Sequence, residues 1–269
     1  MEPGLARDAL TLLLGFTTGV LSALFGIGGA IVSNPGLRAL GAAPLVAVGT
    51  TLPSILPGAI SGTLRYRREG LINWQLIIPA AASGLLAVVA GSLLSHAVPG
   101  GGHLLLLLIA VLLAFTAWRT AVAPPAAPAP EAPAEDVPPS APEGRTRWRA
   151  AGIGVVAGLL SGLLGIGGGV IMVPAFTELL GMSLKSAIAT SLVCVGIFGV
   201  PATITHAFLG DIDWRLAVLL TIGVIPGARI GASLTIRTAE RRLRLAVGIF
   251  LALVALVYFV TETRALLAL

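Results

Sequence analysis

The stretch that decides the fold occurs twice in the chain. One copy reads GFTTGVLSALFGIGGAIVSNP, from Gly15 to Pro35, and the other reads GVVAGLLSGLLGIGGGVIMVP, from Gly154 to Pro174. Their glycines, serines and prolines correspond at a constant offset of 139 residues. Equivalent positions continue to two Gly-x-x-x-Trp sequences, which begin at Gly70 and Gly210. Such agreement indicates an internal duplication, which in a helical membrane protein points to a transporter with its substrate site between the repeats.

The composition is that of a membrane protein. Of 269 residues, 56% are hydrophobic and 11% are charged, and the mean hydropathy is +0.98. A soluble domain usually carries about 25% charged residues, so too little charge is present to cover a soluble surface. The net charge of +5 would suggest nucleic acid as a partner of a soluble protein. Here the basic residues cluster in loops between apolar runs, so we expect a lipid bilayer and no nucleic acid.

Long apolar runs predict an all-α polytopic fold. Runs of about 20 apolar residues can cross the hydrocarbon core as helices, and they lack the alternation of barrel strands. Two homologous repeats of four segments each follow from the duplication. The eight segments cover about residues 9–34, 43–64, 72–95, 103–119, 150–173, 186–208, 214–236 and 245–261.

A Pro/Ala-rich stretch separates the repeats. Residues 123–148 contain too few large apolar side chains to bury a core, so we expect a disordered linker there. The first membrane repeat then covers residues 1–122 and the second covers 149–269. The one cysteine, Cys194, lies in an apolar run and predicts a packing role.

The basic residues distinguish two topologies. If all eight segments cross the membrane, the repeats are parallel and the two sides carry ten and six basic residues. If the first segment of each repeat is re-entrant and folds back at its glycines, the sides carry twelve and four. The stronger bias favours inverted repeats, each with one broken hairpin and three spanning helices, and with both termini outside.

The glycine clusters are the main candidate substrate site. Glycine in a helix interior costs about 1 kcal/mol relative to alanine, so several together predict a break. A break exposes N–H groups at the start of the next half-helix, where anions bind. Close helix packing is the alternative reading, and we favour it for the Gly-xxx-Gly pairs at Gly15, Gly19, Gly154 and Gly158. The predicted substrate-binding glycines are Gly26, Gly28, Gly29, Gly165, Gly167, Gly168 and Gly169.

Hydroxyl groups flank both clusters. Ser22 and Ser161 precede them by one helical turn, and they either face a bound oxyanion or bond to their own helix at the i−4 carbonyl. A pair of hydroxyls also begins the next segment of each half, where the alternative role is hydrogen bonding between helices. These four candidates are Thr50, Thr51, Thr190 and Ser191.

Two titratable residues complete the candidate set. Arg229 lies inside the seventh segment, where it either attracts the anion or extends to the membrane interface. His206 ends the sixth segment and is either a proton relay or an interfacial residue. The apolar segments hold no acidic pair, no His/Cys metal spacing and no Ser-His-Asp set. We therefore expect no enzyme, no cofactor and no bound metal.

The two glycine segments resemble those of the sulfite exporter TauE/SafE family. The resemblance rests on Gly26 to Pro35 and Gly165 to Pro174, and is supported by Ala189-Thr190-Ser191, by His206 with Gly210 to Trp214, and by Pro226 to Gly231. It implies transport of small sulfur-containing anions such as sulfite or organosulfonates, usually outward, across a bacterial-type inner membrane. The two repeats differ at aligned positions within these motifs. Ala30 aligns with Gly169, and Tyr66 aligns with His206.

Together these features predict a membrane transporter. We expect it to export a small sulfur-containing anion by alternating access at the interface of the two repeats. Its partners would be that anion and the bilayer, and a homo-oligomer is compatible with the sequence. An anion channel and a non-transporting membrane scaffold are the alternatives.

Overall fold

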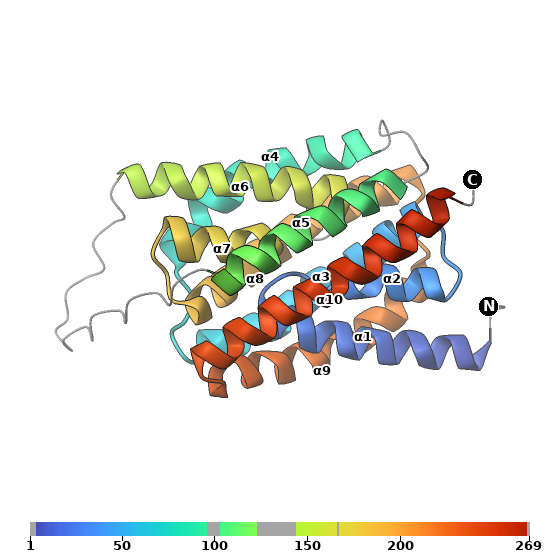
Figure 1. The fold of residues 1–269 in the computed structure, drawn as a ribbon, viewed down its shortest axis with the longest axis horizontal. Coiled ribbons are helices and arrows are strands. Elements are labelled where there is room, and N and C mark those ends of the chain that lie inside the picture. The colour runs from blue at the N-terminus through green and yellow to red at the C-terminus, as the bar shows by residue number, and fades with distance from the viewer. Residues whose placement is uncertain (1–3, 96–102, 123–143, 166, 268–269) are drawn as a thin grey trace.

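The computed structural model describes residues 4–95, 103–122, 144–165 and 167–267, and within these ranges it contains ten α-helices and no strand (Figure 1). The first half holds α1 (Leu5–Phe25), α2 (Ala30–Ala39), α3 (Pro44–Arg67), α4 (Trp74–Ser95) and α5 (His103–Val122). The second half holds α6 (Gly144–Leu164), α7 (Gly169–Leu179), α8 (Leu184–Leu209), α9 (Trp214–Arg237) and α10 (Glu240–Leu267). The predicted linker lies outside the described residues up to position 143.

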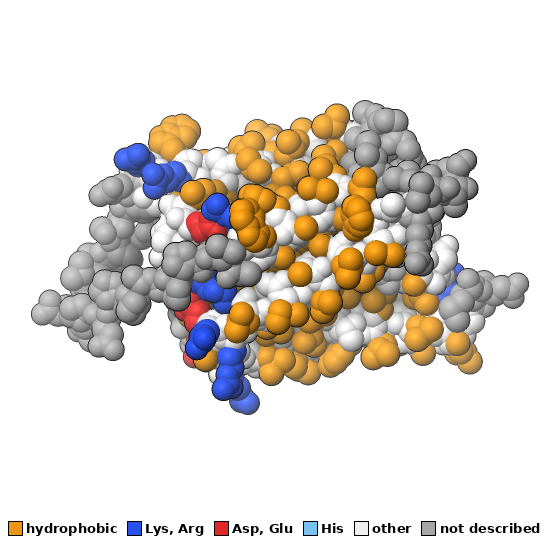
Figure 2. All heavy atoms as spheres, viewed as in Figure 1, with side chains coloured by type: hydrophobic (Ala, Val, Ile, Leu, Met, Phe, Trp, Pro, Cys, Tyr) orange, Lys and Arg blue, Asp and Glu red, His pale blue; other side chains and the backbone are white. Residues whose placement is uncertain are grey.

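Six helices are long and apolar enough to cross a membrane. They are α1, α3, α4, α8, α9 and the Glu240–Thr261 part of α10, each with 21 to 26 residues. At 1.5 Å per residue, 21 residues extend about 31 Å, which matches the hydrocarbon core. Figure 2 shows a broad band of hydrophobic side chains around the middle, with arginine and lysine gathered mainly at the end away from the termini. The chain is a multi-pass membrane protein.

The first segment of each half is broken into two helices. The predicted segment 9–34 forms α1 and the 10-residue α2, and the predicted segment 150–173 forms α6 and the 11-residue α7. Both breaks fall at the glycine clusters, so the predicted helix break is confirmed. Figure 1 shows α1 and α2 toward the end where both termini lie, and α6 and α7 toward the other end.

The first helix of each half packs on a helix of the other half. Helix α1 packs on α9 of the second half, while α6 packs on α4 of the first half. A β-carbon on Gly15 or Gly19 would lie 2.4 or 2.3 Å from a carbonyl oxygen of α9. One on Gly154 or Gly158 would lie 2.1 or 2.4 Å from a carbonyl oxygen of α4. The predicted packing role of these four glycines is therefore confirmed, because no larger residue allows so close an approach.

Candidate functional site

Glycines in the left-handed conformation end α1 and α6. Gly26 has φ +68° and Gly165 has φ +64°, and their N–H groups donate to the carbonyls of Ser22 and Ser161, each at 2.8 Å. A second glycine, two residues further along each cluster, has φ +74° or +80°. Residues with a side chain rarely adopt this left-handed conformation. The glycines therefore allow α1 and α6 to end at these positions.

The two breaks lie against each other in the interior. A β-carbon at Gly167 would lie 3.4 Å from the Cα atom of Gly28, and one at Gly169 would lie 2.2 Å from the carbonyl oxygen of Gly26. All four residues are buried. Non-helical backbone at membrane depth is tolerated only within protein or around a cavity, and these breaks satisfy that condition by contacting one another.

Two helix N-termini begin at this contact. Helix α2 has Gly29 as its N-cap and α7 has Gly168, and neither has a side-chain cap or an acidic residue in its first turn. The first N–H groups of a helix have no partner within the helix, and the helix dipole places partial positive charge there. Both N-termini therefore direct partial positive charge toward the same contact.

Buried hydroxyl groups without a hydrogen-bond partner lie on the helices that end at the breaks. Within the described residues these include Thr18 Oγ1 of α1 and Ser161 Oγ of α6. Thr18 packs on the break itself, because a β-carbon at Gly29 would lie 2.2 Å from its methyl group. A buried donor without an acceptor costs about 1 to 3 kcal/mol, so these groups favour a ligand that accepts hydrogen bonds. Sequence reasoning missed Thr18, although it stands one helical turn before Ser22 on the same predicted segment.

Ser191 is one of the predicted hydroxyl residues that reach a break. Its Oγ lies 2.9 Å from the carbonyl oxygen of Gly26 and 3.0 Å from that of Ile188. Since a hydroxyl has one hydrogen, it donates to one of these at a time. Ser22 is also close, with its β-carbon 3.6 Å from the position that a β-carbon of Gly29 would take.

Thr51, the equivalent of Ser191 in the first half, lies on α3 and belongs to a polar cluster between α3 and α2. Its Oγ1 accepts a hydrogen bond from Ser33 Oγ at 3.0 Å and lies 3.0 Å from Asn34 Oδ1. It also lies 2.9 Å from the carbonyl oxygen of Ala47. The positions of α7 equivalent to Ser33 and Asn34 are apolar, so this cluster exists in one half only.

Thr50 and Thr190 connect the halves at equivalent places. The Thr50 hydroxyl accepts a hydrogen bond from the Asp213 backbone N–H at 2.9 Å, and the Thr190 hydroxyl accepts one from the Asn73 backbone N–H at 3.1 Å. Asp213 and Asn73 directly precede α9 and α4. Of the two readings of these threonines, hydrogen bonding between helices is the one observed.

Arg229 lies on the exposed side of α9. It lines a surface pocket of about 170 Å³ with Ser61, Leu64, Arg65 and Arg68. The structure thus brings Arg229 of α9 together with Arg65 of α3 and Arg68 directly after it, rather than with the glycine breaks.

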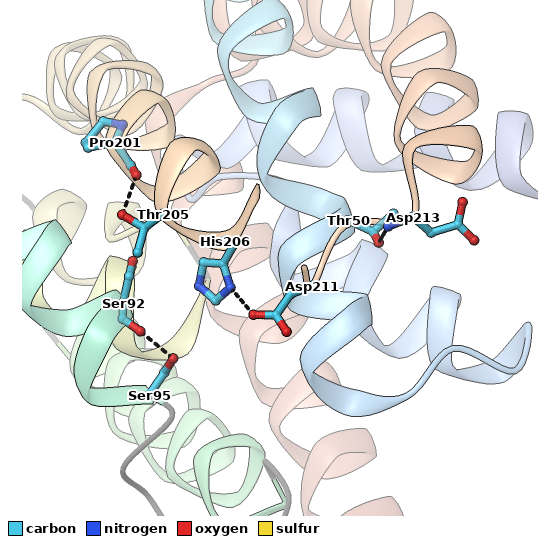
Figure 3. Close-up of polar contacts among 8 residues, drawn as sticks. All are labelled: Thr50, Ser92, Ser95, Pro201, Thr205, His206, Asp211 and Asp213. Atoms are coloured by element: carbon cyan, nitrogen blue, oxygen red, sulfur yellow. Dashed lines mark hydrogen bonds and ion pairs between the residues drawn. The ribbon is translucent and has the colours of Figure 1, made fainter. Parts of the chain in front are cut away.

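His206 is fully buried and forms a pair that sequence reasoning missed. Its Nδ1 lies 2.8 Å from Asp211 Oδ2, and Figure 3 shows the imidazole directed toward that carboxylate. Asp211 packs on α3, since a β-carbon at Gly49 would lie 2.5 Å from its carbonyl oxygen. Asp211 falls in the loop after α8, so a search for acidic residues inside apolar segments passes over it.

Comparison with known proteins places the chain in a family. The family model described as sulfite exporter TauE/SafE matches residues 11–258. A probable membrane transporter protein of Xylella fastidiosa is 29% identical over 227 residues, which cover 84% of this chain and 82% of the relative. The probable membrane transporter protein YunE of Bacillus subtilis is 27% identical, with 91% and 94% covered. No solved structure matches at a significant level. The chain is a membrane transporter and belongs to the sulfite exporter TauE/SafE family.

Proposed function

We propose that the chain exports a small sulfur-containing anion, sulfite or an organosulfonate, by alternating access between its two halves. The observation that carries this proposal is the contact between the Gly28 and Gly167 breaks, where two uncapped helix N-termini begin. The description of the matching family as sulfite exporters supports the substrate class.

In the proposed site, only hydrogen-bond donors contact the anion. The first N–H groups of α2 and α7, which follow Gly28-Gly29 and Gly167-Gly168, would bind its oxygens. The hydroxyls of Thr18 and Ser161 would supply further donors, because each is buried without a partner. No carboxylate lies among these groups, so nothing in the set repels a negative charge. Ser22 and Ser191 are close enough to the breaks to complete it.

Alternating access is the part of the proposal that requires movement. The glycine clusters are buried on all sides, so an anion reaches them only if the halves move apart. With inverted repeats and re-entrant hairpins, the opening toward the cytoplasm and the opening toward the outside would be structurally equivalent. This topology is supported by the exchanged packing of α1 on α9 and α6 on α4, and by the matching bonds of Thr50 and Thr190.

The membrane potential is a sufficient driving force. We assign the chain to a bacterial-type inner membrane with its basic end in the cytoplasm, as the charge bias favours. An inside-negative potential then drives a monovalent anion outward by about 2.3 kcal/mol per 100 mV. Where transport also moves protons, we assign their transfer to the buried His206–Asp211 pair.

Flux measurements in liposomes that contain the purified chain test this function. We expect sulfite or sulfonate efflux that saturates with concentration and follows an imposed potential. Conductance without saturation would favour an anion channel, and absence of flux for every sulfur oxyanion would favour a scaffold. A His206→Gln variant should keep potential-driven flux but lose any dependence on a proton gradient; unchanged gradient dependence would remove the proton role of His206.

A further inference from the structure

A cationic pocket between α3 and α9 has no role in the proposed transport site. It is about 170 Å³ in volume and is lined by Ser61, Leu64, Arg65, Arg68 and Arg229. A water molecule occupies about 30 Å³ of liquid, so the pocket has room for a phosphate group and its nearest atoms. It lies near the basic end of the molecule, where α3 finishes and α9 runs past it.

The pocket has uncompensated positive charge. Arg65 pairs with Glu69, with 2.7 Å between Nη1 and Oε1. Among the described residues no acidic partner is found for Arg68 or Arg229, so three arginines less one glutamate leave two positive charges. Guanidinium groups bind phosphate oxygens through pairs of parallel hydrogen bonds.

Cross-helix bonds fix the pocket in place. Arg65 Nε donates to Ser233 Oγ of α9 at 3.3 Å, and Ser61 Oγ donates to the carbonyl oxygen of Ile225 at 2.7 Å. Both bonds join α3 of the first half to α9 of the second. A ligand in the pocket would therefore contact both halves at once.

An apolar groove adjoins the pocket through Arg229. The groove is about 460 Å³ in volume and follows one face of α9, at residues spaced three or four apart. Its lining consists of Pro226, Arg229, Ile230, Ser233, Leu234 and Arg237. A larger groove between α5 and α10 is lined without any charged side chain and so cannot select a charged ligand.

We propose that this composite surface binds an anionic phospholipid, with its phosphate in the arginine pocket and an acyl chain in the groove along α9. The pocket alone would suit any phosphate or sulfate. The adjoining apolar groove favours a lipid, because only a molecule with both parts fills both hollows. Arginines at the cytoplasmic interface attract the anionic lipids of that leaflet.

Thermal unfolding of the full-length chain in detergent tests the proposal. The probes are phosphatidylglycerol, phosphatidylcholine with the same acyl chains, and inorganic phosphate. A ligand that binds only the folded state raises the melting temperature with its concentration, which yields an apparent Kd. We expect a saturable rise with phosphatidylglycerol, a much smaller one with phosphatidylcholine, and none with phosphate.

Variants identify the site. Arg229→Gln and Arg68→Gln should each weaken the apparent affinity for phosphatidylglycerol about fivefold, as expected for one interfacial arginine. Arg242→Gln is the matched control, because Arg242 is exposed on α10 and does not line the pocket. Equal responses to the two lipids, or wild-type affinity in Arg229→Gln, would overturn the proposal. A full response to phosphate alone would overturn the lipid assignment and leave a soluble-anion site.

Discussion

Gly28 and Gly167, which stand at equivalent positions of the two repeats, lie in contact: a β-carbon at Gly167 would be 3.4 Å from the Cα atom of Gly28. Each belongs to a break between a long helix and a short one. The contact therefore joins the two halves at the points where the helical hydrogen bonding of each half is interrupted. Several experiments follow from this relationship and from the polar groups around it.

A side chain at Gly169 should damage the contact between the breaks. Gly169 has no left-handed conformation to lose, yet its β-carbon would lie 2.2 Å from the Gly26 carbonyl oxygen. We expect Gly169→Ala to lower the free energy of unfolding by about 1 to 3 kcal/mol, as overpacking does, and to reduce flux.

Gly152→Ala is the control for that substitution. Gly152 lies within α6 with no neighbour within 4 Å of its β-carbon position, so alanine there should be neutral or stabilise by up to about 1 kcal/mol. Melting temperatures of both variants in detergent give the comparison. Equal melting temperatures of Gly169→Ala and Gly152→Ala would contradict the close contact between Gly169 and the Gly26 carbonyl oxygen.

Removal of the Ser161 hydroxyl should not weaken the protein in the absence of an anion. Ser161 is 1% exposed and its hydroxyl has no partner, so Ser161→Ala relieves a buried unsatisfied group. We expect unchanged stability or a gain of about 1 kcal/mol in anion-free buffer. Ser33→Ala serves as the contrast, because Ser33 bonds to Thr51 at 3.0 Å and should lose about 1 kcal/mol. Equal losses in both variants would mean that Ser161 is already bonded within the protein.

Thr50 and Thr190 should have matching effects on stability. Each hydroxyl accepts a backbone hydrogen bond from the opposite half, at 2.9 and 3.1 Å. Thr50→Val and Thr190→Val leave a backbone N–H without its acceptor, so we expect each to cost about 1 to 3 kcal/mol in chemical unfolding. Serine at the same positions retains the hydroxyl and should recover most of the loss. A large effect at one threonine and none at the other would contradict the equivalence of the two halves.

Cysteine labelling from outside the cell decides the topology. Ala239 is exposed between α9 and α10, and Ala43 is exposed before α3. In the inverted arrangement Ala239→Cys is cytoplasmic and stays unlabelled by an impermeant reagent, while Ala43→Cys is labelled. The native Cys194 is buried and should not react. Labelling of both positions from outside would instead require eight crossings and parallel repeats.

Local signals were enough to predict the helices and their breaks. Apolar runs specify membrane helices because backbone groups in lipid must bond within the segment. Clusters such as Gly26 to Gly29 specify breaks because glycine weakens a helix at each position. The pairing of α1 with α9 could not be predicted, since Gly15 and Gly19 reveal that a close neighbour exists but not which helix supplies it.

The candidate site was predicted less completely for the same reason. Ser191 was selected from its repeat position, and the structure places it on Gly26 of the other half. Asn34 and Asp211 gain their importance only from tertiary contacts: Asn34 Oδ1 lies 3.0 Å from Thr51 Oγ1 of α3, and Asp211 meets His206 after the end of α8. Arg229 was selected as an intramembrane cation, but its long side chain reaches an exposed pocket instead.

Anion binding to the purified chain tests the glycine-break site most directly. The measurement is the melting temperature of the wild type, Ser161→Ala and Thr18→Val as sulfite or a small sulfonate is added, with chloride at equal ionic strength as the reference. We predict a saturable rise for the wild type and a much weaker response in both variants, although each folds as stably as the wild type without the anion. Responses in the variants equal to that of the wild type, or no response of the wild type to any sulfur oxyanion, would contradict binding at the two breaks.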